Sequence, residues 1–122
     1  MKTILMVGLG GFFGSIARYY TQLLFNKLFL HPFPFGTLTA NVAGCFIIGI
    51  IFALGLRQGV LSDEWKLFLA VGFCGGFTTF SSFSLENINL MQSGQYVLSF
   101  TYVIASVVLG LMATLLAIHL FR

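Results

Sequence analysis

Polar and small side chains are concentrated in one stretch of an otherwise apolar chain, residues Gly72–Glu86. The stretch reads GFCGGFTTFSSFSLE, so three glycines, two threonines, three serines and one carboxylate interrupt the apolar sequence. A polar group that lies in lipid without a hydrogen-bond partner costs several kcal/mol. Filling a membrane does not require this much polarity, so the stretch is predicted to line a pathway or a binding site.

The side chains of this stretch favour an anion as the ligand. Cation sites use rings of carboxylates or converging carbonyl groups, whereas here Glu86 is the one acid among hydroxyl groups. Phe77, Phe80 and Phe83 recur every three residues, and the edge of an aromatic ring is positive enough to contact a small anion. A full positive charge would bind such an anion too tightly to release it. Filling of a buried helix face or contact with lipid is the alternative role for the three rings.

The glycines of the stretch predict a local break in its helix. Gly72, Gly75 and Gly76 precede Thr78 and Thr79, and each glycine weakens a helix by about 1 kcal/mol. Carbonyl groups freed at a break need donors, water or a cation as partners in the membrane. A break near mid-membrane could therefore hold a structural cation at a dimer axis, while the side chains of the same segment serve an anion.

No combination of residues in the chain suits catalysis. His31 and His119 lie at the edges of apolar runs, without a cysteine or serine at a spacing typical of a nucleophile and its base. Cys45 and Cys74 are isolated within apolar runs and form no metal-binding motif. Glu86 alone provides no acid–base pair. The sequence therefore predicts that the protein is not an enzyme.

The composition indicates an integral membrane protein. Hydrophobic residues make up 58% of the 122 residues and charged residues only 7%, whereas a soluble domain has about 25% charged residues. The six lysines and arginines are scattered, so membrane lipid is an expected partner and nucleic acid is not. The length suits a single domain, residues 1–122.

Four apolar runs are expected to position the candidate residues. Helices are predicted at about 3–25, 36–56, 64–91 and 96–121, each long enough to cross a hydrocarbon core of about 30 Å. The expected fold is therefore an all-α membrane protein, a bundle of four transmembrane helices with a break in the third. In the first helix, the spacing of Gly10 and Gly14 suits the close approach of another helix.

Two polar residues in the first two helices each allow two interpretations. Arg18 would lie about 23 Å along a helix that begins near residue 3. There it either extends toward the far interface or faces an aqueous vestibule that concentrates anions. Asn41 either hydrogen-bonds a neighbouring helix or donates its amide to an anion in a pore. The sequence favours neither interpretation for Arg18 and the first for Asn41.

The basic residues give only a weak preference for one orientation in the membrane. With four helices, both termini and the loop at residues 57–66 share one side, which carries four of the six lysines and arginines. The opposite side has at most two, Lys27 and Arg18. Insertion in both orientations is therefore a hypothesis, and it would permit an antiparallel homodimer.

Three motifs together resemble the Fluc (CrcB) family of fluoride channels, and the resemblance covers essentially the whole chain. They are Gly10-Gly11-x-x-Gly14-x-x-x-Arg18-Tyr19, Gly36-Thr37-Leu38-x-x-Asn41-x-x-Gly44 and the run from Gly72 to Phe83. The third motif departs from the usual T-T-F-S-T-F pattern at Ser82, which keeps a hydroxyl group.

The resemblance implies an antiparallel, dual-topology homodimer that contains two fluoride pores. It also implies a structural sodium ion (Na+) at the dimer interface, bound by the backbone carbonyls of Gly75 and Thr78 at the break of the third helix. The fluoride pathway that it implies comprises Phe80, Phe83, Asn41, Ser81, Thr79, Glu86, Tyr102, Ser106 and, at the vestibule, Arg18.

The function implied by the resemblance is that of a passive, fluoride-selective channel. It would span the bacterial inner (cell) membrane several times and export cytoplasmic fluoride, which relieves fluoride toxicity. The alternative is a proton-coupled exporter similar to the small multidrug resistance family. That family relies on a carboxylate in its first helix, and residues 3–25 contain none. A structural subunit that transports nothing is a third interpretation.

Overall fold

The computed structural model describes all 122 residues and contains helices but no β-strand. Two long helices, α1 (Lys2–Leu28) and α2 (Phe35–Gly55), come first, and the chain ends in a third, α6 (Tyr96–Phe121). Between α2 and α6 lie α3 (Asp63–Lys66), a π-helical stretch η1 (Leu67–Cys74), α4 (Gly75–Phe77) and α5 (Phe80–Gln92). The all-helical fold class predicted from the sequence is confirmed.

Three helical segments are long and apolar enough to cross a membrane: Phe35–Gly55, Asp63–Gln92 and Tyr96–Phe121. Helix α1 is also long, at 27 residues, but it is not among the three. The helices are therefore those of a protein that can cross a membrane several times. A fourth crossing, by α1, stays a prediction.

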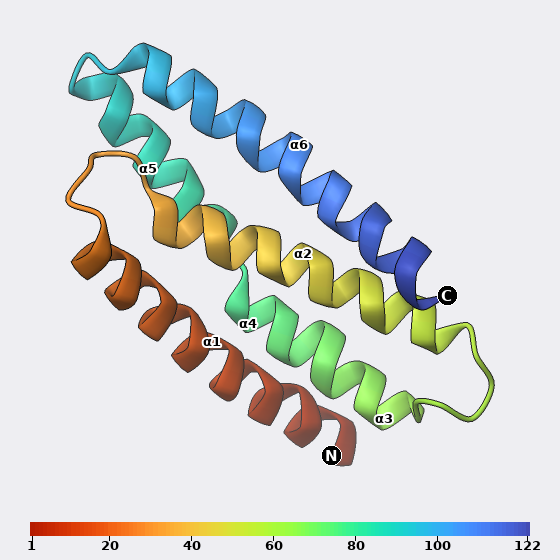
Figure 1. Cartoon of the computed structure of the whole chain (residues 1–122). Helices are drawn as coiled ribbons and strands as arrows, with labels where there is room; N and C mark the ends of the chain where they lie inside the picture. Colours follow the sequence, from red (N-terminus) through yellow and green to blue (C-terminus); the bar gives the residue numbers. More distant parts are fainter.

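The helices run alongside one another, with the segmented region in the middle (Figure 1). Segments η1 and α4 lie between α1 and α2, while α6 lies along α2 and continues beside α5. Both termini lie at one end of the molecule, together with the loop between α2 and α3. The loop between α1 and α2 and the turn between α5 and α6 lie at the opposite end. The junction of α4 and α5 is thus far from both ends.

Helix α1 packs against η1 and α4 through backbone contacts, along a face that we call the glycine seam (Gly10, Gly14, Gly72 and Gly76). A Cβ atom added at Gly10 would lie 2.9 Å from the Cα of Gly72, and one added at Gly76 would lie 2.7 Å from the backbone of α1. At Gly14, an added Cβ would overlap the carbonyl oxygen of Phe73. Side chains larger than hydrogen would therefore force the helices apart. The close approach predicted for Gly10 and Gly14 is confirmed.

The segment Asp63–Gln92 is not one continuous α-helix. Its second part, Leu67–Cys74, is π-helical. The π-helix is rare in proteins, and where it occurs it is often found at a functional site. Farther along, the backbone is extended at Thr78 (φ −87°, ψ 157°) and Thr79 (φ −151°, ψ 119°). Helix α4 ends before these two residues and α5 begins after them, so the helical hydrogen-bond pattern is interrupted there.

We expect Gly14→Ala to lower the free energy of unfolding by about 1–3 kcal/mol, because the added methyl group would overlap the backbone of Phe73. Gly8→Ala is the matched control in the same helix, since a Cβ added there meets nothing within 4 Å. Thermal unfolding of both variants in detergent, followed by tryptophan fluorescence, measures the difference. Equal melting temperatures for the two variants would contradict the tight packing of the seam.

Candidate functional site

The interruption at Thr78 and Thr79 leaves backbone groups without their helical partners. In a continuous helix the N–H groups of Thr79 and Phe80 would donate to the carbonyls of Gly75 and Gly76. The extended backbone at Thr78 and Thr79 removes this arrangement. In lipid each freed group needs another hydrogen-bond partner. The side chains of the neighbouring helices can supply such partners.

Asn41 of α2 binds both backbone groups of Thr79. Its Nδ2 donates to the Thr79 carbonyl oxygen at 3.1 Å, and its Oδ1 accepts from the Thr79 N–H at 2.8 Å. The hydroxyl oxygen of Thr79 accepts from the N–H of Ser82 at 3.1 Å, which caps α5, and lies 3.2 Å from the hydroxyl of Ser81. The expectation that Asn41 hydrogen-bonds a neighbouring segment is confirmed. Its contact with an anion stays a prediction.

Arg18 of α1 reaches the break from the opposite side. Its Nε donates to the carbonyl oxygen of Gly76 at 3.0 Å. The two interpretations drawn from the sequence placed this side chain at an interface or in a vestibule. The hydrogen bond to the Gly76 carbonyl decides between neither interpretation, and a contact between Arg18 and the ion stays a prediction.

The carbonyl oxygens of Gly75 and Thr78 have lost their helical donors. The Thr79 N–H, which would serve Gly75, is bound to Asn41, and the Ser82 N–H, which would serve Thr78, is bound to the Thr79 hydroxyl. Gly75 is exposed, and a Cβ added there would meet nothing within 4 Å. No group of three or more His, Cys, Asp or Glu side chains could hold a metal ion. A cation at the break would therefore depend on these carbonyl oxygens, which are ligands that hard cations accept.

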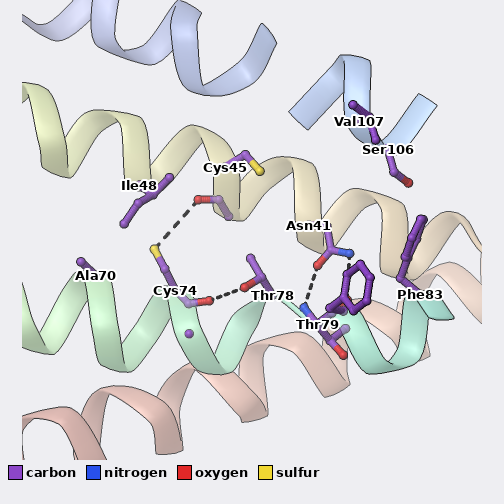
Figure 2. Close-up of a pocket in the computed structure, with 13 residues that line it drawn as sticks. Asn41, Cys45, Ile48, Ala70, Cys74, Thr78, Thr79, Phe83, Ser106 and Val107 are labelled. Atoms are coloured by element: carbon purple, nitrogen blue, oxygen red, sulfur yellow. Dashed lines mark hydrogen bonds between the residues drawn. The ribbon is translucent and has the colours of Figure 1, made fainter. Parts of the chain in front are cut away.

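A groove of about 490 Å³ lies over the break (Figure 2). Phe80 is 78% exposed, and its ring centroid is 5.6 Å from that of Phe83. The hydroxyl oxygen of Ser106 is buried without a hydrogen-bond partner. The groove contains no charged side chain; it is lined by Asn41, Gly44, Cys45, Ile48, Ala70, Cys74, Gly75, Thr78, Thr79, Phe80, Phe83, Ser106 and Val107.

Beyond Phe83 the groove meets a cluster of hydrogen bonds around Glu86. The ring of Phe83 packs at 4.9 Å against that of Tyr102, which is fully buried. The Tyr102 hydroxyl donates to Glu86 Oε1 at 3.0 Å, and the Thr37 hydroxyl donates to Glu86 Oε2 at 2.8 Å. Gln22 of α1 donates from Nε2 to the Thr37 hydroxyl oxygen at 3.1 Å. Four elements thus contribute to this cluster: α1, α2, α5 and α6.

Two cavities lead from Glu86 toward the end of the molecule that carries the loop between α1 and α2. Their volumes are about 260 and 330 Å³, and Glu86 lines both. The polar residues of their linings are Gln22, Asn26, Thr37 and Ser82 in the first, and Asn26, His31, Asn89, Ser93 and Gln95 in the second. Polar and aromatic groups therefore continue from the break to this end of the bundle.

The structure gathers most of the predicted pathway residues along this line. The groove holds Asn41, Thr79, Phe80, Phe83 and Ser106, with Ser81 hydrogen-bonded to Thr79, and the cluster holds Glu86 and Tyr102. Arg18 lines neither the groove nor the two cavities beyond it.

The contact between Gln22 and Thr37 could not be predicted from the sequence. Gln22 is a polar residue within an apolar run, and Thr37 follows Gly36 in a motif, but their pairing across two helices has no local signature. It follows only from the packing of α1 on α2.

Comparison with known proteins places the chain in a family. Residues 5–118 match the family described as CrcB-like protein, Camphor Resistance (CrcB). The chain belongs to the CrcB family. Among relatives named "Fluoride-specific ion channel FluC", that of Flavobacterium psychrophilum is 50% identical over 93% of this chain and 92% of its own length. The relative from Leptospira interrogans is 46% identical over 90% and 87% of the two chains, and that of Trichlorobacter lovleyi is 45% identical over 100% and 98%.

The CrcB match includes every element of the site described above. It begins before the glycine seam and ends after Ser106, the last residue of the groove that carries a hydroxyl group. The break, the groove and the Glu86 cluster therefore all belong to the part of the chain that defines its family.

We expect Asn41→Ala to destabilise this CrcB protein by about 1–3 kcal/mol, because the Thr79 N–H would lose its partner. Asn89→Ala is the control, because the side chain of Asn89 is exposed and makes no hydrogen bond. Chemical or thermal unfolding in detergent compares the two variants. If Asn41→Ala were as stable as Asn89→Ala, the bonds from Asn41 would not stabilise the break.

Proposed function

We propose that this chain is a passive, fluoride-selective channel that exports cytoplasmic fluoride and thereby relieves fluoride toxicity. The observation that carries the proposal is the near full-length similarity to relatives named "Fluoride-specific ion channel FluC", up to 50% identity over 93% of the chain. Those relatives are ion channels by name, so this chain is a channel and not an enzyme. The inner membrane of a bacterium is the proposed location, which the membrane-spanning helices and the bacterial relatives support.

The groove has the chemistry that a small anion requires. It offers hydroxyl and amide groups from Thr79, Ser106 and Asn41, and the rings of Phe80 and Phe83, whose positive edges suit an anion, with no carboxylate and no full positive charge. Fluoride could therefore be held weakly enough to move on. The contact between Phe83 and Tyr102 then leads to hydroxyl groups of the Glu86 cluster, which continue the pathway.

The driving force for export is electrical. In acidic surroundings fluoride is protonated to neutral HF. HF crosses the membrane and ionises again inside the cell. A passive channel lets the anion leave, because the inside of the membrane is negative. The proton-coupled exporter is not favoured: α1 contains no carboxylate, and Glu86 lies in the segment Asp63–Gln92.

The working channel is proposed to be an antiparallel, dual-topology homodimer of four-helix subunits, each with a broken third transmembrane helix. Phe80 supports this assembly, because a ring that is 78% exposed beside the groove would gain cover from a second copy. The resemblance to the family supplies the antiparallel arrangement. The count of basic residues is four against at most two, Lys27 and Arg18, which is only a weak preference for one orientation.

A sodium ion is proposed to bind where the two copies meet, held by the carbonyl oxygens of Gly75 and Thr78. Both oxygens have lost their helical donors to other groups, and Gly75 is open on its outer side. Such an ion would stabilise these carbonyls, which lipid would otherwise leave unpartnered.

Purified protein in proteoliposomes is expected to pass fluoride but hardly any chloride. Phe80→Ile and Phe83→Ile are each expected to lower fluoride flux about tenfold, which corresponds to a loss of about 1.4 kcal/mol of ring-edge stabilisation at the barrier. Phe12→Ile is the control, since Phe12 is an exposed ring of α1 outside the groove. Equal fluoride and chloride flux, or full activity of the double variant, would overturn the assignment.

The same assay in N-methylglucamine instead of sodium should show reduced flux, and unchanged flux would contradict the sodium proposal.

Labelling of engineered cysteines tests the dual topology. Gln58→Cys and Leu30→Cys, each in a background without Cys45 and Cys74, place exposed thiols at opposite ends of the molecule. If both orientations occur, an impermeant maleimide should label about half of the copies of each variant from outside the cell. Complete labelling of one variant and none of the other would establish a single orientation.

A further inference from the structure

We propose that Arg18 is a positioning residue for fluoride conduction, which holds the freed Gly76 carbonyl through its Nε–H and so fixes the break that places Phe80. This inference rests on the proposed function. It assigns to Arg18 a role that depends on one N–H group at a defined position, and not on the positive charge of the guanidinium group.

Arg18 takes the place of the Phe80 N–H as the hydrogen-bond donor to the Gly76 carbonyl. In a continuous helix the Phe80 N–H would donate to the Gly76 carbonyl, but Phe80 is the first residue of α5 and follows two extended residues. The Arg18 Nε lies 3.0 Å from this oxygen. A side chain from α1 thus supplies the hydrogen bond that the main chain of the broken segment cannot make.

The glycine seam brings Arg18 to this carbonyl. Gly10, Gly14 and Arg18 are spaced by four residues, so they share one face of α1. The first two lie against the backbone of η1 and α4, and a Cβ added at Gly76 would lie 3.1 Å from the N atom of Ser15. The next turn of α1 therefore reaches the point where α4 ends, and that turn carries Arg18.

Arg18 lies outside the groove and the two cavities of the proposed pathway. The two ion pairs of the structure join Lys2 to Glu64 and Lys66 to Asp63, so no carboxylate neutralises the charge of Arg18, and this charge has to be tested separately from the hydrogen bond. The carbonyl of Gly76 is its one hydrogen-bond partner. Arg18 does not line the groove or the two cavities near Glu86, so its link to the pathway runs through the backbone that joins Gly76 to Phe80.

Three substitutions separate the hydrogen bond from the charge. Arg18→Gln places a neutral N–H donor at the same number of bonds from Cα as the arginine Nε. Arg18→Lys keeps the charge but has a methylene group at that position, with its ammonium one bond farther out. Arg18→Met has neither donor nor charge. Lys27→Gln is the control for loss of a basic residue from α1, because Lys27 is exposed and makes no ion pair.

Fluoride flux in proteoliposomes is the first measurement. Arg18→Gln and Lys27→Gln are expected to remain within about threefold of the wild type, whereas Arg18→Lys and Arg18→Met are expected to fall about tenfold or more. High flux in Arg18→Lys with low flux in Arg18→Gln would overturn the proposal in favour of electrostatic attraction. Normal flux in all three Arg18 variants, or low flux in all three, would also overturn it.

Hydrogen exchange in nanodiscs, measured by mass spectrometry, tests the same contact without using fluoride. Peptides that cover residues 77–82 should exchange faster in Arg18→Lys and Arg18→Met than in the wild type and Arg18→Gln, while peptides from α6 stay unchanged. Equal exchange in all four proteins would contradict the contact. If the wild type conducts no fluoride, the proposed function fails, yet the exchange pattern still decides whether Arg18 holds the break.

Discussion

Every backbone polar group in a lipid environment needs a partner, and this requirement governs the structure around Thr79. The break between α4 and α5 leaves the carbonyl of Gly76 and the N–H of Thr79 without their helical partners. Side chains of two other helices satisfy them, Arg18 from α1 and Asn41 from α2. Three separate parts of the chain are therefore joined at one point. The glycine seam serves the same contact, because it lets α1 come close enough for Arg18 to reach.

The break has consequences for the surface next to it. Because the hydroxyl of Thr79 caps a new helix, α5 starts at Phe80 and turns this ring outward beside the groove, while Phe83 lies against Tyr102. The donors of the Gly75 and Thr78 carbonyls are used elsewhere, and a Cβ added at Gly75 would meet nothing within 4 Å. One short segment thus presents carbonyl oxygens and aromatic rings without any charged side chain in the groove.

Patterns within one helix could be predicted from the sequence, whereas contacts between distant residues could not. The length of the apolar runs indicated the long helices, and the spacing of Gly10 and Gly14 indicated the close packing of α1. The partner of Arg18 could not be predicted, because a backbone carbonyl has no sequence signature. The contact of Gln22 with Thr37 depends on the rotation of two helices about their axes, which composition does not fix.

The π-helical stretch Leu67–Cys74 was also not predicted, since its residues have the same apolar character as those of an ordinary helix. The place of Tyr102 in the pathway follows from the family resemblance alone, whereas Glu86 belongs to the polar stretch that the sequence itself singles out. Local reasoning could not place a tyrosine of the last helix on a carboxylate of the preceding one.

The order of the partners along the chain bears on how the protein is made. Arg18 and Asn41 both precede the break in sequence, so α1 and α2 leave the ribosome before residues 76–79 do. The side-chain partners of Gly76 and Thr79 are therefore already present when the break enters the membrane. Tyr102, which emerges later, donates its hydroxyl hydrogen bond to the side chain of Glu86 and to no backbone group of the break. A chain with the same contacts but its helices in another order would have to insert unpartnered backbone groups and wait for their partners.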